Sequence, residues 1–268
     1  MKSLAAIAVN GFRESVRDKV LYNLVLFAIL LIGASYLIGQ LTAGQDIKII
    51  KDLGLAATSV FGLFIAVFIG IGLVAKEVER RSVYSLLAKP IHRYQLVLGK
   101  YAGLVVTLTV NVAIMALSLY LVLAYMRWGV DPMIEASWDA RALDPALLQA
   151  ILLILLELMI VTAIALFFST FSSPILSAAF TFGITVAGHY ATDLRNFQDV
   201  VDAPIAQHVA RAVYWILPNL AQFDIKSQVV HGHAVSARYI GLVSAYAVVY
   251  IAMLLVISTV VFSRRDFK

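Results

Sequence analysis

Long apolar runs separated by short charged stretches dominate the hydrophobic pattern of this chain. A run of about 18 to 20 apolar residues predicts a helix that crosses a membrane. The fourth and fifth runs are divided at Pro174, because proline disfavours helix in the residue before it and has no N–H to donate. The pattern predicts six crossings, over residues 20–40, 53–75, 97–126, 146–170, 174–191 and 239–262. The expected fold is an all-α integral membrane protein.

Two amphipathic stretches accompany these runs. Residues 2–18 place apolar and charged positions on different helical faces, which predicts a helix lying in the membrane interface before the first crossing. Residues 192–238 carry apolar positions at helical spacing and predict a helical outer segment that lies on the outer leaflet or re-enters it. The first apolar run is too long for the apolar core of a signal peptide, so we expect the N-terminal stretch to be retained.

Composition excludes a water-soluble fold. The chain of 268 residues is 62% hydrophobic and 14% charged, whereas soluble domains are roughly 45 to 50% apolar and about 25% charged. Six crossings take nearly half of the chain and leave little room for a soluble enzyme domain. The absence of cysteine excludes a disulfide framework and a thiolate metal site.

The net charge of +5 comes from basic residues that lie beside the apolar runs. Thirteen of the Lys and Arg residues fall on the side of the two termini and residues 76–94, and eight fall on the other side. Because cytoplasmic loops carry the excess of basic residues, both termini and residues 76–94 are expected in the cytoplasm. Membrane lipids, and not nucleic acid, are then the expected partners of these charges.

The stretch from 76 to 93 is the most informative loop. Before Pro90 it can form a short helix with Val83, Leu86 and Leu87 on one face and charges of both signs on the others. Such a helix could dock into a groove of a partner protein, with the apolar residues as anchors. A solvated loop that only sets topology explains the same residues equally well on physical grounds.

Several motifs occur in a characteristic order along the chain. They are the acidic pair Glu77 and Glu79, then Ser82, Leu86, Leu87, Pro90, Arg93 and Gly99-Lys100, then Leu217-Pro218-Asn219 with Phe223-Asp224, and a C-terminal stretch from Phe262 to Phe267. In this order and spacing the sequence resembles the ABC-2 type permease family, the membrane subunits of type V ABC exporters. The resemblance covers essentially the whole chain and implies a single permease domain over 1–268. Arg81-Ser82 departs from the Gly-Thr that many relatives carry there.

The resemblance implies roles for several segments. Residues 76–94 would be the coupling helix, which receives the ATP-driven closure of a separate ABC ATPase subunit, and residues 1–19 would be the connecting helix beside it. The coupling residues would be Glu77, Glu79, Arg80, Arg81, Val83, Tyr84, Leu86 and Leu87. The permease would be non-catalytic, with ATP and Mg bound by the ATPase. It would pair with a second copy in a prokaryotic cytoplasmic membrane, with the substrate path between the copies.

The sequence contains no phosphate-binding loop, which agrees with ATP binding by a separate subunit. An ATPase cradles phosphates with a G-x-x-x-x-G-K-[ST] loop, and Gly99-Lys100 is followed by Tyr101 and lacks the earlier glycine. A secondary transporter, which would need ionisable residues in several spans, remains an alternative. A multipass membrane enzyme acting on lipids, which would need a polar cluster at one membrane face, is another.

Glu157 is an isolated acidic residue within the leucine-rich fourth run. An ionised carboxylate facing lipid is unfavourable by about 2.5 to 3.5 kcal/mol, so we expect Glu157 to face the bundle or a dimer interface, with Asn111 or Thr162 as neighbours. A place in the translocation path and a structural polar contact between helices are both compatible with this position. His231 and His233 near Asp224 form a weak metal-binding pattern, and no metal site is expected.

Small residues recur in the second and fifth runs and predict close approach between helices. They are Gly62, Gly70, Gly72, Ser177, Ala178, Gly183 and Gly188. This pattern favours a packed bundle.

Overall fold

The computed structural model describes residues 2–41, 46–79, 92–128, 141–191 and 216–264, with the single positions 130, 207 and 214. Within these ranges every regular element is a helix and there is no strand. The prediction of an all-helical fold is therefore confirmed.

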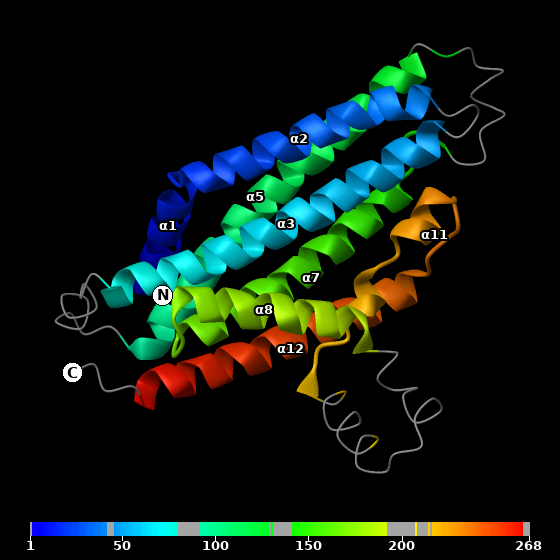
Figure 1. Cartoon of the computed structure of the whole chain (residues 1–268). Helices are drawn as coiled ribbons and strands as arrows, with labels where there is room; N and C mark the ends of the chain where they lie inside the picture. Colours follow the sequence, from blue (N-terminus) through cyan, green and yellow to red (C-terminus); the bar gives the residue numbers. More distant parts are fainter. Residues whose placement is uncertain are drawn as a thin grey trace.

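Five of the described helices are long and apolar enough to cross a membrane. They are α2 (Lys19–Gln40), α3 (Asp46–Glu79), α5 (Arg93–Trp128), α7 (Ala146–Ser169) and α12 (Ala237–Arg264). They run roughly along one direction in Figure 1. Large apolar side chains on their outer faces stay exposed, among them Leu30, Leu121 and Val249 at 57 to 69%. Because exposed surfaces of this kind need an apolar solvent, the chain is a multi-span membrane protein.

The fifth predicted crossing is a helix, but it is short. Helix α8 (Pro174–His189) has 16 residues, which at 1.5 Å per residue is about 24 Å, against a hydrocarbon core of about 30 Å. Nε2 of its last residue, His189, lies 3.2 Å from a carboxylate oxygen of Glu157, in the middle of α7. Helix α8 therefore ends about halfway along α7.

The chain that returns toward the last crossing packs with its apolar side against the bundle. It contains the 3-10 helix η2 (Leu220–Phe223) and the short helix α11 (Lys226–Val230). Their side chains Leu220, Phe223 and Val229 are no more than 1% exposed. A Cβ on Gly188 would lie 2.7 Å from the carbonyl oxygen of Pro218, so a larger residue at the end of α8 would block this packing.

Helix α3 begins earlier than the predicted crossing at residue 53. It starts at Asp46 and takes Lys51 into the bundle, where this side chain is 0% exposed. The Lys51 ammonium donates a hydrogen bond of 2.6 Å to the carbonyl oxygen of Arg141. A charge in a span is unfavourable, which is why the apolar pattern placed the start after Lys51. The carbonyl partner on the α5–α7 connection offsets part of that cost.

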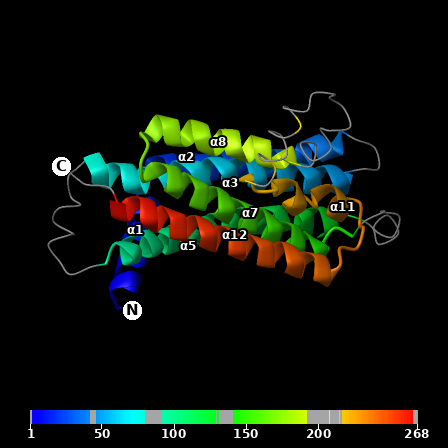
Figure 2. The ribbon, with the colours of Figure 1, turned by 90° about the horizontal axis from the view of Figure 1, so that it is seen from below.

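The amphipathic helix expected over residues 2–18 is α1 (Lys2–Val16). It stands at a steep angle to the long helices at one end of the bundle, and the view from below also shows it at that end (Figures 1 and 2). A Cβ on Gly103 would lie 2.6 Å from the carbonyl oxygen of Ala8, and a Cβ on Gly99 would lie 2.8 Å from Cβ of Ile7. These two glycines of α5 therefore let α1 pack directly on it.

The end of the bundle that carries α1 is called the α1 end below. Helix α5 begins there and α12 finishes there, and Arg93 joins the two. Its Nη1 donates to the carbonyl oxygens of Phe262 at 3.2 Å and Ser263 at 2.6 Å. A cation at the C-terminus of a helix also interacts favourably with the helix dipole. The hydrogen bond between Lys51 and Arg141 lies at the opposite end.

The predicted close contacts of small residues hold at some positions only. A Cβ on Gly70 would lie 2.8 Å from Cβ of Ala165, and a Cβ on Gly62 would collide with Leu158, so α3 and α7 approach closely there. Gly72 and Gly183 have no such neighbour within 4 Å. For these two the prediction was wrong, because small size permits an approach without showing which face of the helix carries a neighbour.

Candidate functional site

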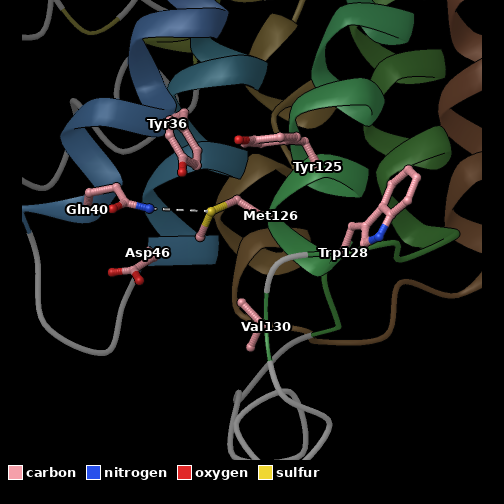
Figure 3. Close-up of a pocket in the computed structure, with 7 residues that line it drawn as sticks. All are labelled: Tyr36, Gln40, Asp46, Tyr125, Met126, Trp128 and Val130. Atoms are coloured by element: carbon pink, nitrogen blue, oxygen red, sulfur yellow. Dashed lines mark hydrogen bonds between the residues drawn. The ribbon is translucent and has the colours of Figure 1, made fainter.

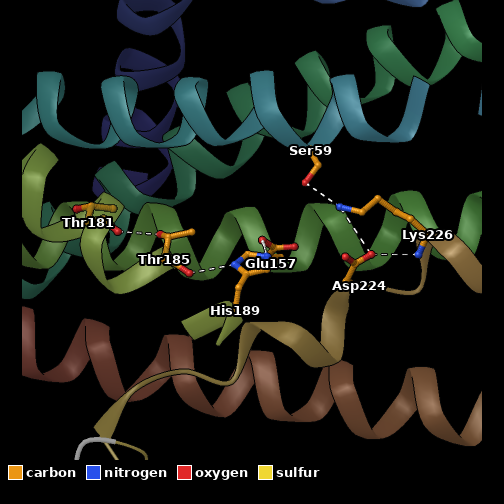
Figure 4. A network of polar contacts seen from close by, with 7 residues as sticks. All are labelled: Ser59, Glu157, Thr181, Thr185, His189, Asp224 and Lys226. Atoms are coloured by element: carbon orange, nitrogen blue, oxygen red, sulfur yellow. Dashed lines mark hydrogen bonds and ion pairs between the residues drawn. The ribbon is translucent and has the colours of Figure 1, made fainter. Parts of the chain in front are cut away.

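A buried acid–histidine contact connects the middle of α7 to the end of α8. Glu157 is 4% exposed, and its Oε1 lies 3.2 Å from Nε2 of His189 (Figure 4). The expected neighbours use their donors elsewhere: Nδ2 of Asn111 donates to the carbonyl oxygen of Thr107, and Oγ1 of Thr162 to that of Leu158. The carboxylate partner is thus a histidine that the sequence analysis did not pair with it.

The geometry of this pair fixes the proton on Nδ1 of His189. Nδ1 of His189 is 3.0 Å from the carbonyl oxygen of Thr185, and a carbonyl can only accept, so Nδ1 carries a hydrogen. One further proton lies between Nε2 and Glu157. The pair is then either an imidazolium with a carboxylate or a neutral imidazole accepting from a carboxylic acid. Both arrangements satisfy the buried oxygen, which offsets the cost of burying Glu157.

Helix α8 presents a polar stripe toward α3 and α7. The stripe consists of Ser177, Thr181 and Thr185, spaced four residues apart, and each is at most 2% exposed. His189 follows at the same spacing. Each threonine hydroxyl donates to the carbonyl oxygen four residues earlier, at 2.6 Å and 2.8 Å. Oγ of Ser177 is buried with no hydrogen-bond partner in the part of the chain that the structure describes. The spacing of four was the signal in the sequence that could have revealed this stripe.

A second polar group attaches the returning segment to α3. Nζ of Lys226 lies 3.7 Å from Oδ1 of Asp224 and donates to Oγ of Ser59 at 3.4 Å (Figure 4). Ser59 and Lys226 are 167 positions apart, so no local pattern could have paired them. The two polar groups hold α8 and α11 to the α3–α7 core.

The histidines that precede α12, His231 and His233, do not join these groups. His231 and His233 are exposed, and their rings stack with centroids 6.4 Å apart. Nδ1 of His231 lies 2.8 Å from the carbonyl oxygen of Ser227. Across the residues with described positions, no three His, Asp or Glu side chains are grouped so that they could hold a metal ion.

The predicted coupling residues span the position in the sequence where α3 ends. The helix backbone runs through Glu77 and Glu79 and ends there. The remaining members lie outside the described residues: Arg80, Arg81, Val83, Tyr84, Leu86 and Leu87. Arg93, which follows this stretch, begins α5. The coupling role of these residues stays a prediction.

The membrane-length helices, the short α8 and the returning segment packed against it define a polytopic helical membrane protein. Its buried polar contacts join helices to one another. A comparison with protein families finds that the model of the ABC-2 family transporter proteins matches residues 5–267, nearly the whole chain. The chain therefore belongs to the ABC-2 transporter family. The sequence matches none of the individually curated proteins with which it was compared.

Proposed function

We propose that this chain is the permease subunit of an ATP-driven exporter in a prokaryotic cytoplasmic membrane. The observation that carries the proposal is the family match over residues 5–267, because it takes in all the membrane-length helices and both polar groups. The sequence has no G-x-x-x-x-G-K-[ST] loop. ATP and Mg²⁺ binding, and hydrolysis, therefore belong to a separate ABC ATPase. Two copies of the permease enclose the substrate path.

The contacts at the α1 end support a route for coupling. The stretch 76–94 connects the end of α3 directly to the start of α5. Arg93 ties that start to the end of α12, and Gly99 and Gly103 seat α1 on α5. A displacement of this stretch would therefore move α3, α5, α12 and α1 together. Close packing at Gly70 passes movement of α3 to α7, and the Glu157–His189 contact passes it to α8.

Cysteine labelling tests the orientation. Because the chain has no cysteine, a single introduced cysteine reports on one position only. In intact cells a membrane-impermeant maleimide should label Ala234→Cys, in the exposed stretch before α12, and should label Ser85→Cys only after permeabilisation. The opposite labelling pattern would show that residues 76–94 face outward, and the coupling proposal would fail.

The ATPase partnership is tested by purification and turnover. The tagged full-length chain, taken from membranes of its native host, should bring an ABC ATPase with it, and the reconstituted complex should hydrolyse ATP. Glu79→Ala and Val83→Ala should each reduce permease-stimulated turnover about tenfold, because truncating an interface anchor costs about 1 to 2 kcal/mol. Val249→Ala, the same change at an exposed position of α12, is the control and should leave turnover unchanged.

Two results would contradict the proposal. One is normal ATPase binding and turnover in both coupling variants. The other is substrate transport by the purified chain alone in proteoliposomes driven by an ion gradient, which would identify a secondary transporter.

A further inference from the structure

A cavity of about 520 Å³ is lined by residues of α2, α3 and α5 (Figure 3). The ends of these helices that line it lie at the end of the bundle opposite α1 (Figure 1). The cavity is formed where α2 ends, α3 begins and α5 ends. Its volume is in the range of small-molecule pockets, about 300 to 1,000 Å³. Neither of the polar groups described above contributes to it, so it is a separate feature of the molecule.

Aromatic rings from two helices line this cavity. Tyr36 of α2 and Tyr125 of α5 meet edge to face, with ring centroids 5.5 Å apart and an interplanar angle of 68°. Trp128, in the last turn of α5, also lines the cavity and is 91% exposed. The faces of Trp and Tyr rings attract cations, most strongly where the cation is partly removed from water. The Tyr36–Tyr125 pair, with Trp128 at the exposed rim of the cavity, favours an organic cation as the ligand.

The charge of the cavity lining agrees with that ligand. Among the described lining residues only Asp46 carries a formal charge, and it is negative. Nε2 of Gln40 donates to Sδ of Met126 at 3.9 Å, and these two side chains form an uncharged part of the cavity wall (Figure 3). Asp46 is also the first residue of α3, where a carboxylate interacts favourably with the helix N-terminus. Its half-buried side chain still lines the cavity.

We propose that this cavity binds a substituted ammonium group. The methyl or methylene groups of the cation pack against Tyr36, Tyr125 and Trp128, and its charge faces Asp46. Two sources carry this chemistry: the headgroup of a choline lipid in the membrane and a free organic cation. Tyrosine and tryptophan also occur as simple anchors at membrane interfaces, but such a belt requires neither a cavity nor a carboxylate in its wall. The site does not depend on ATP-driven export.

Fluorescence of the full-length protein tests the site. The chain has three tryptophans, so Trp138→Phe with Trp215→Phe leaves Trp128 as the only one. In nanodiscs of phosphatidylglycerol alone, choline chloride should change Trp128 emission in a saturable way. The uncharged isostere of choline, with a tert-butyl group in place of trimethylammonium, should bind at least about tenfold more weakly, because it lacks the cation–π and carboxylate attraction.

Variants with matched controls locate the binding. Asp46→Asn, which keeps a residue suited to a helix start, should weaken choline about tenfold, whereas Asp52→Asn, an exposed aspartate of the same helix outside the cavity, should not. Tyr125→Leu should weaken choline to a similar extent, and Tyr22→Leu, on an exposed part of α2, should not. Unchanged melting temperatures show that the variants are folded. If Asp46→Asn fails to fold, Tyr125→Leu and the isostere decide the question.

A change of lipid separates the two sources. If the natural occupant is a lipid headgroup, nanodiscs of phosphatidylcholine should suppress the response to free choline. If the occupant is a free cation, the response should be the same in both lipids. Equal binding of choline and its isostere, or equal choline binding by the wild type, Asp46→Asn and Tyr125→Leu, would overturn the proposal. So would the absence of any saturable response in both lipids.

Discussion

Replacing Gly103 by alanine is expected to displace α1 from α5 and to destabilise the protein by about 2 kcal/mol, within the usual range for overpacking. The added methyl group would lie 2.6 Å from the carbonyl oxygen of Ala8 and 3.2 Å from the backbone nitrogen of Phe12. Backbone atoms of a helix cannot rotate away as a side chain can, so α1 as a whole must shift. Thermal unfolding in detergent should show a lower melting temperature.

The same substitution at open positions is the control. Gly33 and Gly183 are helical glycines with no other group within 4 Å of an added Cβ. Alanine there should leave stability unchanged or raise it slightly, because alanine is the better helix former by about 1 kcal/mol. A Gly103→Ala protein as stable as these controls would show that α1 does not pack on α5 in solution. Under the proposed function, Gly103→Ala should also reduce stimulated ATP turnover while Gly183→Ala does not.

Separating the Glu157–His189 pair should have the second large effect. His189→Leu leaves Glu157 buried without its partner, and we expect a loss of about 2 to 3 kcal/mol, below the full value for a buried pair because a third of the His189 side chain is exposed. Glu157→Leu should cost less, because a neutral His189 ring can still donate to the carbonyl oxygen of Thr185 and leaves no buried charge without a partner. The double variant should be close to the wild type in stability, since an apolar contact replaces the polar one.

Thermal unfolding of all four proteins gives the coupling energy between the two residues. The matched control is His231→Leu. His231 makes the same kind of contact with the carbonyl oxygen four residues earlier, but it is exposed and has no ion pair in the described part of the chain. Equal losses in His189→Leu and His231→Leu, or additive losses in the double variant, would show that the pair does not hold α8 to α7.

Glu157→Gln, which retains a hydrogen-bonding side chain, tests transport. Loss of transport activity at normal stability would place Glu157 in the translocation path.

Much of the helical layout could be predicted from the apolar pattern. The run at 20–40 became α2, which starts one residue earlier and ends at the predicted residue. Pro174 begins α8 as predicted, because proline fits the first turn of a helix and not its interior. The amphipathic stretch at 2–18 became α1. The errors arose where a charge lies within a helix. Lys51 was read as the edge of a crossing because its carbonyl partner, Arg141, comes 90 positions later.

The candidate site was less predictable. Glu157 could be singled out because a carboxylate in an apolar run is costly, and its burial inside the bundle follows from the same cost. Its partner could not be predicted, because His189 closes a contact between two helices whose relative shift no periodicity records. The cavity of Tyr36, Asp46 and Tyr125 is assembled in the same way from three separate helices.

The sequence by itself determined that this chain is a helical membrane protein of the ABC-2 family, since length, hydropathy and motif order are local properties that lipid and family resemblance constrain directly. Only the tertiary structure decided how far α8 reaches, which glycines face a neighbour, and which polar groups meet. Those features depend on the rotation and axial shift of each helix, and these are set by close packing and by hydrogen bonds between residues far apart in the chain.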